Sequence, residues 1–348
     1  MKSIIACFAF VLLSLSSSVA QKLLPVQIKG NWGYIDRSGK IVVEPGYPAA
    51  GAFSEGLALV IKDGKIGYMG ENGKMSIPAK FEEATPFYEG MAAFKEDSKW
   101  GFINKKGETV IAPQFAYASR FKEGLCRVKQ TPTVFDKWGY IDKTGSFVIA
   151  PTFQRAADFS EGLALVGNEE EKYGYIDTKG NLMIPYRFAY GMIINDNGMQ
   201  NFPEGEFGEG LAAVTFGGKW GYIDRTGHLT IDTIYDDAGK FSEGLAPASI
   251  SGRYGYIDTK GNIAIPMIYD KTLIFSEGLG AAKTGGKADG KFGFVNHQGE
   301  MVIPSQFEGS MWSPLPYAFK DGILFTYFEG QDWGYIDKTG NVLWKNKP

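Results

Sequence analysis

Few residues in this sequence are of the types that commonly carry out catalysis. There are two histidines, His228 and His297, and each lies beside a glycine in a predicted turn. Neither has an acid and a nucleophile in a comparable setting, so the spacing predicts no catalytic triad. Cysteine and histidine also do not recur at the spacing of metal ligands. The sequence therefore predicts no catalytic residue, no metal site and no cofactor.

Carboxylates are the chemically active groups that do recur. An Asp or Asn begins eight short segments of the form Asp-x-x-Gly, and a Glu precedes a Gly in a second repeated segment. Rows of acids can bind Ca²⁺, but the Gly-Gly-x-Gly-x-Asp nonapeptide of calcium-binding repeats is absent. Asp at the first position of a turn accepts a hydrogen bond from the backbone two residues on, and Gly at the fourth supplies a left-handed conformation. We therefore expect these acids to shape turns.

The turns belong to a unit of about 34 residues that occurs nine times. Each unit has an aromatic residue or Ile, then Gly, then Tyr or Phe, then an aliphatic residue. A period of this length sustained over the whole chain indicates an array or a propeller. The motif pairs are Trp32–Gly33, Ile66–Gly67, Trp100–Gly101, Trp138–Gly139, Tyr173–Gly174, Trp220–Gly221, Tyr254–Gly255, Phe292–Gly293 and Trp333–Gly334.

Residues 208–234 illustrate what one unit predicts. Apolar runs at 211–214, 220–224 and 229–231 are separated by Gly-rich turns, which predicts a three-stranded antiparallel meander. A glycine inside a strand usually marks a close approach, so we expect Gly221 to receive an aromatic or aliphatic group from a neighbouring strand or unit. In most units a Pro then ends the third strand, and apolar residues three apart predict a helical turn in the link to the next unit.

The segments Trp-Gly-Tyr-Ile-Asp-x-x-Gly and Phe-Ser-Glu-Gly-Leu-Ala resemble those of the WG-repeat, or KWG-repeat, family of bacterial secreted and envelope β-repeat proteins. The resemblance covers residues 24–345. It implies an all-β repeat architecture and says little about activity, because the family has no shared catalytic residues to carry over. The chain departs from the pattern at Ile66, at Gly70, over 186–206 and over 305–332.

The fold class we predict is all-β, with about nine tandem three-stranded meanders. The first unit begins with its own first strand at 25–28, and the last ends with its own third strand at 341–344. No strand is left over to complete a shared blade, and nine units exceed the usual four to eight blades of a propeller. We therefore expect an open solenoid or superhelical stack, with a closed propeller-like ring as the alternative.

The N-terminus has the features of a secretion signal. A positive start, an apolar run at 4–15 and small residues at Ser18 and Ala20 predict a signal peptide over residues 1–20, cleaved near Ala20. The apolar run is too short to span a membrane. We expect residues 21–348 to form the repeat array in an extracytoplasmic location, which is the periplasm, the cell surface or the medium.

Composition narrows the classes of partner. The formal net charge is −3, and no basic block suggests nucleic acid or an anionic membrane surface. Cys126 is the one cysteine beyond the signal peptide, so no intramolecular disulfide is possible. It stands where other units have Ala or Gly, which predicts a small buried residue.

These observations predict a non-catalytic scaffold that binds a protein or a component of the cell envelope. A carbohydrate- or peptidoglycan-binding module is the alternative; an enzyme is less favoured, because turns explain the recurring polar residues. Binding tends to lie on insertions that break a repeat, which here are 130–137, 167–172, 186–206 and 284–291, with the divergent segment 311–317. The candidate binding residues are Tyr190, Met192, Phe202 and Trp312.

Overall fold

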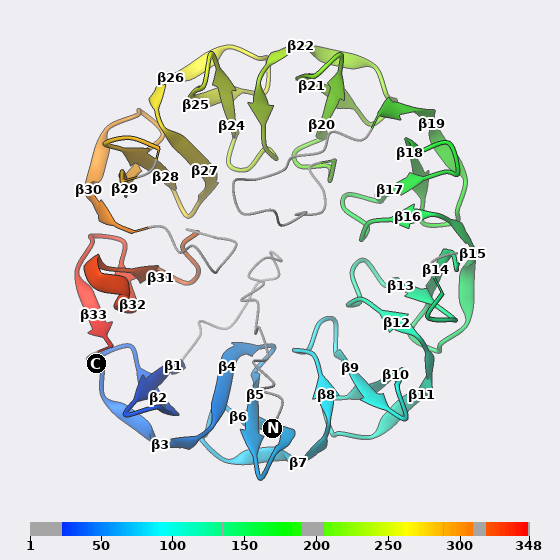
Figure 1. Ribbon diagram of the computed structural model, residues 1–348, viewed down its shortest axis with the longest axis vertical. Helices are drawn as coiled ribbons and strands as arrows, with labels where there is room; N and C mark the ends of the chain where they lie inside the picture. The colour runs from blue at the N-terminus through cyan, green and yellow to red at the C-terminus, as the bar shows by residue number, and fades with distance from the viewer. Residues whose placement is uncertain (1–22, 134–135, 190–204, 288, 309–317, 347–348) are drawn as a thin grey trace.

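The computed structural model describes residues 23–133, 136–189, 205–287, 289–308 and 318–346. These residues form nine small antiparallel sheets, which are arranged as the blades of a ring (Figure 1). We number the blades from 1 at the N-terminus to 9 at the C-terminus. Within the described ranges, no helix has the length and apolar character needed to cross a membrane.

Each blade contains the predicted three-stranded meander. The first strands are β1 (Leu23–Ile28), β5 (Leu57–Lys62), β9 (Met91–Glu96), β13 (Cys126–Lys129), β17 (Leu163–Gly167), β20 (Leu211–Phe216), β24 (Leu245–Ile250), β28 (Leu279–Thr284) and β31 (Ile323–Tyr327). The second strands are β2 (Asn31–Asp36), β6 (Lys65–Gly70), β10 (Lys99–Asn104), β14 (Trp138–Ile141), β18 (Lys172–Asp177), β21 (Lys219–Asp224), β25 (Arg253–Asp258), β29 (Lys291–Val295) and β32 (Trp333–Asp337).

The third strands form the perimeter of the ring (Figure 1). They are β3 (Ile41–Tyr47), β7 (Met75–Phe81), β11 (Thr109–Phe115), β15 (Phe147–Phe153), β19 (Leu182–Ala189), β22 (Leu229–Tyr235), β26 (Ile263–Tyr269), β30 (Met301–Phe307) and β33 (Val342–Lys345). A short 3₁₀ helix, η1 (Glu329–Gln331), precedes the second strand of blade 9.

The link between units is a strand in six blades, so the predicted helical turn is wrong there. In blade 3, for example, Glu83 and Ala84 pair with Lys95 and Phe94 of the first strand. The link therefore becomes the edge strand of the next blade on the side of the ring axis. These inner strands are β4 (Ala49–Ser54), β8 (Glu83–Ala84), β12 (Tyr117–Ala118), β16 (Arg155–Ala156), β23 (Asp237–Ala238) and β27 (Lys271–Ser276).

The strand directions place the turns on two opposite faces of the ring. In blades 2 to 9 the first strand starts at the Glu-Gly turn, which is Asp-Gly in blade 9, and the second strand returns to end at the Asp-x-x-Gly turn or its equivalent. These two kinds of turn therefore share one face, which we call the clasp face. The turns between first and second strands, and the crossings from each blade to the next, share the other face, which we call the hairpin face.

The glycine of each motif pair lies under a bulge in the third strand. In blade 3, Trp100 is opposite Phe115 and Phe102 is opposite Ile111, so residues 112–114 face the single Gly101. A Cβ atom on Gly101 would lie 2.5 Å from the carbonyl oxygen of Ile111, and at all nine motif glycines a backbone atom of the third strand lies closer than 3 Å to such a Cβ.

Two sequence expectations about this region are therefore wrong. At Gly221 the space is filled by third-strand backbone and the Thr233 methyl group, whereas we expected an aromatic or aliphatic group; in other blades a third-strand side chain adds to the backbone, as Met75 does at Gly67 and Phe147 at Gly139. The proline does not end the third strand either: Pro113 lies inside β11 at the bulge. A bulge is one of the few places in a sheet where a residue without an N–H donor is tolerated.

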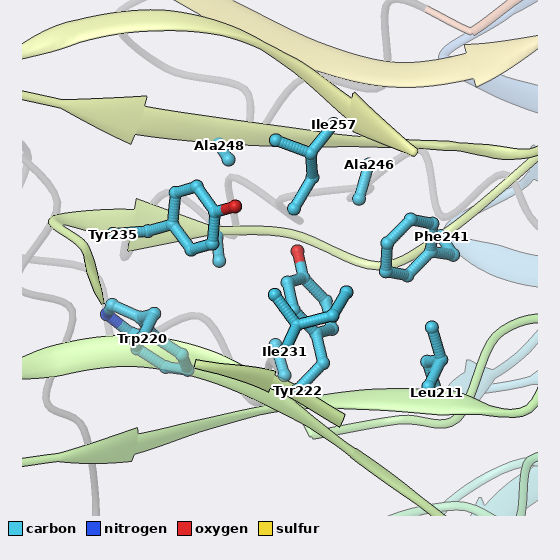
Figure 2. Packing of buried hydrophobic residues seen from close by; sticks show 11 residues of the cluster. Leu211, Trp220, Tyr222, Ile231, Tyr235, Phe241, Ala246, Ala248 and Ile257 are labelled. Carbon is cyan, nitrogen blue, oxygen red and sulfur yellow. The ribbon is translucent and has the colours of Figure 1, made fainter. Parts of the chain in front are cut away.

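The core is divided among the boundaries between blades. Tyr222 of blade 6 packs with Phe241 and Ala246 of blade 7, and Ile257 of blade 7 packs back against blade 6 (Figure 2). One face of a second strand therefore packs on the following blade and the other face on the preceding blade. Tyr222 and Ile257 are fully buried. Nine such clusters occur among the described residues, one at each boundary.

The ring is closed, so the expected open solenoid is wrong. At the boundary between blades 9 and 1, Leu24 and Val26 pack with Ile323 and Tyr335 in a cluster built like the others. The Tyr335 hydroxyl donates a hydrogen bond to the carbonyl oxygen of Pro25 at 2.8 Å. The architecture is a nine-bladed β-propeller (Figure 1).

Closure requires no strand shared between the first and last units. The indole rings of Trp32 and Trp333 stack across the seam, with their centroids 5.4 Å apart. In blade 7, the Tyr256 hydroxyl also reaches the Ala281 carbonyl oxygen, in the first strand of blade 8, at 3.0 Å. Pro25 is the counterpart of Ala281 in blade 1, so the seam uses a contact that also occurs inside the ring.

Candidate functional site

The Glu of each Glu-Gly turn has a backbone conformation that Glu rarely adopts. Glu161 has φ of 54° and Gly162 has φ of 78°. Two successive left-handed residues make a type I′ turn, in which Asn, Asp or Gly is preferred. The left-handed conformation costs an ordinary residue about 1–2 kcal/mol. Positive φ recurs at the equivalent residues Glu55, Glu89, Glu123, Glu161, Glu209, Glu243, Glu277 and Asp321.

A contact between blades offsets that cost. The Glu161 carboxylate in blade 5 accepts hydrogen bonds from the amides of Glu209 at 2.7 Å and Gly210 at 2.9 Å, in the turn of blade 6. Seven consecutive turns bond the next turn in this way, from Glu55 in blade 2 to Gly322 in blade 9. We call this contact the carboxylate clasp.

Cations from the Asp-x-x-Gly turns reinforce some of the clasps. Lys105 Nζ in blade 3 lies 2.8 Å from the carbonyl oxygen of Glu55 and 3.3 Å from its carboxylate. Lys143 in blade 4 makes the same pair of contacts with Glu89. The recurring Glu is therefore used in folding, with its carboxylate directed at the following blade.

The Asp of the Asp-x-x-Gly turns acts as the sequence predicts. Asp224 Oδ1 accepts hydrogen bonds from the amides of Thr226 and His228, each at 2.9 Å, and from the Thr226 hydroxyl at 2.6 Å. The Thr226 hydroxyl, aided by the His228 and Thr226 amides, holds the pKa of the Asp224 carboxyl below its usual value. Both recurring acids therefore have a role in shaping or joining turns.

The two histidines and the cysteine lie in different blades. His228 is exposed, as expected for a turn residue. His297 is half-buried in a blade joint, which the sequence did not predict: its Nε2 lies 3.0 Å from the Glu243 carbonyl oxygen and its ring packs on Phe275. Cys126 is fully buried, as predicted, and burial raises the pKa of its thiol. Among the described residues, no three His, Cys, Asp or Glu side chains are grouped as metal ligands would be.

A cavity of about 360 Å³ lies between blades 5 and 6, near His228. Phe216, Ile223 and Leu229 supply apolar wall, and the Arg187 guanidinium at its edge donates to the Gly227 carbonyl oxygen. His228 and Thr233 also line the cavity, so its wall offers mostly apolar contact with a few polar groups.

The candidate binding residues Tyr190, Met192, Phe202 and Trp312 lie outside the described residues. Three of the sequence insertions can nevertheless be assigned to a face by the strands that flank them. Residues 130–137 connect β13 to β14, residues 167–172 span the turn from β17 to β18, and residues 284–291 span the turn from β28 to β29. All three replace the tight turn between first and second strands, so all three lie on the hairpin face.

A group of charged residues near the axis was missed by the sequence analysis. The sequence signal that could have revealed this group is the residue just before the Phe of the Phe-x-Glu-Gly segment. The repeat motif leaves that position free to vary. Blades 2, 3, 8 and 9 have Ala52, Pro86, Ile274 and Ala318 at this position. Blades 4 to 7 instead have Arg120, Asp158, Glu206 and Lys240.

Two carboxylates organise this group, which we call the axial cluster. Asp158 accepts from Arg127 Nε at 2.8 Å and from the Ser119 hydroxyl at 3.0 Å, and Arg120 Nε lies 3.4 Å away. The Asp158 side chain is only 11% exposed. This half of the axial cluster joins blades 4 and 5.

The second carboxylate of the axial cluster, Glu206, joins blades that are not neighbours. Lys122 of blade 4 and Lys240 of blade 7 both contact Glu206 Oε2 in blade 6, at 3.2 and 3.4 Å. Lys240 Nζ also donates to the hydroxyl of Ser160 in blade 5, at 3.1 Å. Side chains of four successive blades therefore converge beside the axis, near the clasp face.

The family model that describes a WG containing repeat matches most of the chain. The matched segments are 32–65, 66–100, 100–131, 138–170, 173–199, 220–254, 254–287 and 292–311. No curated protein matches the chain in sequence.

Solved structures align with this chain at low sequence identity. The crystal structure of a eukaryotic initiation factor aligns with a TM-score of 0.57 at 10% identity, covering 94% of this chain and 96% of that one. The computationally designed Ika8 protein aligns with a TM-score of 0.47 at 13% identity, covering 84% of this chain and 93% of that one. BamB from Moraxella catarrhalis aligns with a TM-score of 0.40 at 13% identity, covering 91% of this chain and 97% of that one. At 10% identity the likeness to the initiation factor concerns the fold alone.

Proposed function

The chain belongs to the WG containing repeat family, and on that premise we propose that it is a non-catalytic scaffold that binds a protein or another component of the cell envelope. The signal-like residues 1–20 support an extracytoplasmic location. The proposal concerns a rigid ring whose repeated residues build the frame and whose divergent segments contact the partner.

The observation that carries this proposal is the shared face of the insertions. Residues 130–137, 167–172 and 284–291 come from blades 4, 5 and 8, yet all project on the hairpin face. Binding residues are commonly carried on loops that a rigid scaffold positions. We therefore infer that the partner contacts the hairpin face.

The recurring polar groups favour a scaffold over an enzyme. Catalysis needs an acid, a base or a nucleophile held together at one place. The recurring Glu and Asp are instead distributed around the ring, where each bonds amides of a turn, as Glu161 and Asp224 do. This distribution is typical of residues that stabilise a fold. A catalytic site would have to lie in the segments that depart from the repeat.

Affinity capture with shortened loops tests the proposal. Residues 131–136 and 169–171 would each be replaced by Asp-Gly, the two-residue turn that joins β5 to β6 at Asp63–Gly64, which keeps the register of Gly167 opposite Tyr173. We expect the mature wild-type protein to capture a defined partner from its own envelope fraction and the shortened variants to lose it, with thermal unfolding unchanged. Capture that survives both replacements would contradict a partner site on the hairpin face.

Two further experiments test the class of partner and the location of the protein. Binding on a glycan array, lost with the same loop replacements, would assign a carbohydrate partner in place of a protein. Fractionation of cells that express the full chain should place the protein outside the cytoplasm with residues 1–20 removed. Recovery of full-length protein in the cytoplasm would contradict that part of the proposal.

A further inference from the structure

We propose that the axial cluster of blades 4 to 7 binds a small polyanion through its carboxylate or phosphate oxygens. This site is independent of the proposed partner surface, because it lies beside the axis near the clasp face rather than on the hairpin face. The ligand would be bound chiefly by the ammonium groups of Lys122 and Lys240, with the guanidinium of Arg120 beside them.

The axial cluster is positively charged. Among the described residues, Arg120, Lys122, Arg127 and Lys240 contact only two carboxylates, those of Asp158 and Glu206. The axial cluster therefore carries an excess of two positive charges in a chain whose formal net charge is −3. A local excess of one sign of charge attracts ions of the opposite sign.

The two lysines of the axial cluster are only partly solvated. The Lys122 side chain is 18% exposed and that of Lys240 is 35% exposed. An ammonium group has three donors, yet Lys122 Nζ contacts a single oxygen, Oε2 of Glu206, among the described residues. Partly desolvated donors without acceptors are unfavourable, and an oxyanion would supply the missing acceptors to both lysines.

Equivalent joints elsewhere in the ring are made without these charges. The equivalent joint between blades 2 and 3 is made by the Ser54 hydroxyl donating to the Phe87 carbonyl oxygen at 2.6 Å. Between blades 8 and 9, Ser276 does the same with Phe319 at 2.7 Å. Since Ser160 keeps this bond to Phe207 at 2.8 Å, the charged side chains are additional to the joint.

The carboxylates of the nearest clasps are already engaged. Glu123 follows Lys122 directly in the sequence, but its two oxygens accept the amides of Glu161 and Gly162 at 2.7 and 2.8 Å. Glu161 is used in the same way by blade 6. These carboxylates therefore point into the neighbouring turns, and Asp158 and Glu206 are left as the contacts of the four cations.

Calorimetric titration of the mature protein with inorganic phosphate and, separately, with citrate tests the site. Both titrations would be made at low, constant ionic strength, with chloride as the control for screening. We expect saturable binding of at least one anion, weakened at least tenfold by the double change Lys122→Met and Lys240→Met. Glu206→Gln should strengthen binding severalfold, because it removes the carboxylate that competes for the two ammonium groups.

Lys320→Met is the matched control. Lys320 occupies the position of Lys122 in blade 9, where Ala318 replaces the charged residue of the axial cluster, and its loss should leave the affinity unchanged. An equal loss of affinity in the control, or no saturable binding of either anion, would overturn the site. If the double variant does not fold, the sign of the Glu206→Gln effect decides, since weaker or unchanged binding contradicts the proposal.

Discussion

Gly221 shows at the scale of one residue why the motif requires glycine. A Cβ atom there would lie 2.5 Å from the Ile231 carbonyl oxygen and 2.9 Å from backbone of Asp232. Backbone held in a sheet cannot move aside as the tip of a side chain can, so overpacking is expected to cost about 1–3 kcal/mol. We therefore expect Gly221→Ala to lower the free energy of unfolding by that amount, measured by urea denaturation.

Gly46→Ala provides the comparison for this prediction. Gly46 also lies in a strand, β3, but its φ is not positive and an added Cβ would come no closer than 3.9 Å to the Glu44 carbonyl oxygen. A surface change of this kind is usually within about 0.5 kcal/mol of neutral. Equal losses at Gly46 and Gly221 would show that crowding by the third strand is not the cause.

The turn aspartates should make stability depend on pH. The pKa of Asp224 is lower in the folded protein than its usual value because the Thr226 hydroxyl and nearby amides bond the ionised form. This stabilisation is present above the unfolded pKa of about 3.9 and is lost as the pH falls through the folded pKa. Asp224→Asn keeps an acceptor oxygen, as Asn104 and Asn296 do in their own turns.

We therefore expect Asp224→Asn to reduce the loss of stability between pH 7 and pH 3. Urea midpoints at the two pH values measure the effect, with wild type as the reference. An unchanged difference between the midpoints would mean that Asp224 is not among the groups that bind a proton on unfolding.

At the scale of elements, the meanders could be predicted and the inner strands could not. The alternation and turn residues of 208–234 locate β20, β21 and β22, although β22 continues through its bulge to Tyr235. The spacing of apolar residues in the link is misleading because it combines residues of two blades. Phe81 ends blade 2 and Phe87 belongs to blade 3, yet both rings pack on the ring of Tyr68, with centroids 6.3 and 4.8 Å from its centroid.

The candidate site was predictable only where its contacts are local. Asp224 bonds residues two and four positions ahead, and the sequence motif contains all of them. The clasp joins Glu55 to Gly90, one full unit away, so no local pattern reveals it. The remaining signal was the residue type, because Glu is an unusual choice at a position where type I′ turns prefer Asn, Asp or Gly.

The clasp predicts an order of stability for two changes at Glu161. Glu161→Ala loses both hydrogen bonds to blade 6 and keeps an unfavourable left-handed residue, whereas Glu161→Gly loses the bonds but removes that strain. Bonds to a charged group contribute about 1.5–3 kcal/mol each when buried and less when half-exposed. Wild type should be most stable, Glu161→Gly intermediate and Glu161→Ala least stable, by urea midpoint.

Glu171 is the control because it has the strain without the clasp. Its φ is 56° in an exposed turn on the hairpin face, and no clasp partner is present among the described residues. Glu171→Gly should raise stability by about 1 kcal/mol. If Glu161→Gly were also stabilising, the carboxylate clasp would not be what keeps Glu in these turns.

At the scale of the whole molecule, the sequence defined nine units but not how they are arranged around an axis. Every contact between adjacent units, such as the core around Tyr222, could be made in an open stack or a ring, because closure depends on the small rotation between neighbours. We expected an open stack because the chain leaves no strand over at either end to complete a blade shared across the seam. The structure closes without one, through Tyr335 with Pro25 and Trp32 with Trp333.

Closure makes stability depend on the number of blades. In an open stack, each unit contacts only its neighbours, so removing the last unit would cost about one interface. In this ring, removing residues 309–348 exposes the apolar sides of blades 1 and 8 at once, including Leu24 and Val26. Eight blades could meet again only by changing the rotation at every boundary, each of which is close-packed.

We therefore expect the chain without blade 9 to lose cooperative thermal unfolding and to aggregate, as measured by circular dichroism and size-exclusion chromatography. A circular permutant keeps every blade and provides the control: Asn346 is joined to Leu23 by a flexible linker, and the chain is opened at the exposed turn Asp63–Gly64. The linker has to cross from the hairpin face, where β33 ends, to the clasp face, where β1 begins, as residues 82–90 do between β7 and β9. With a linker of that length the permutant should unfold cooperatively near the wild-type temperature. A cooperative eight-unit chain beside an unfolded permutant would instead support an open stack.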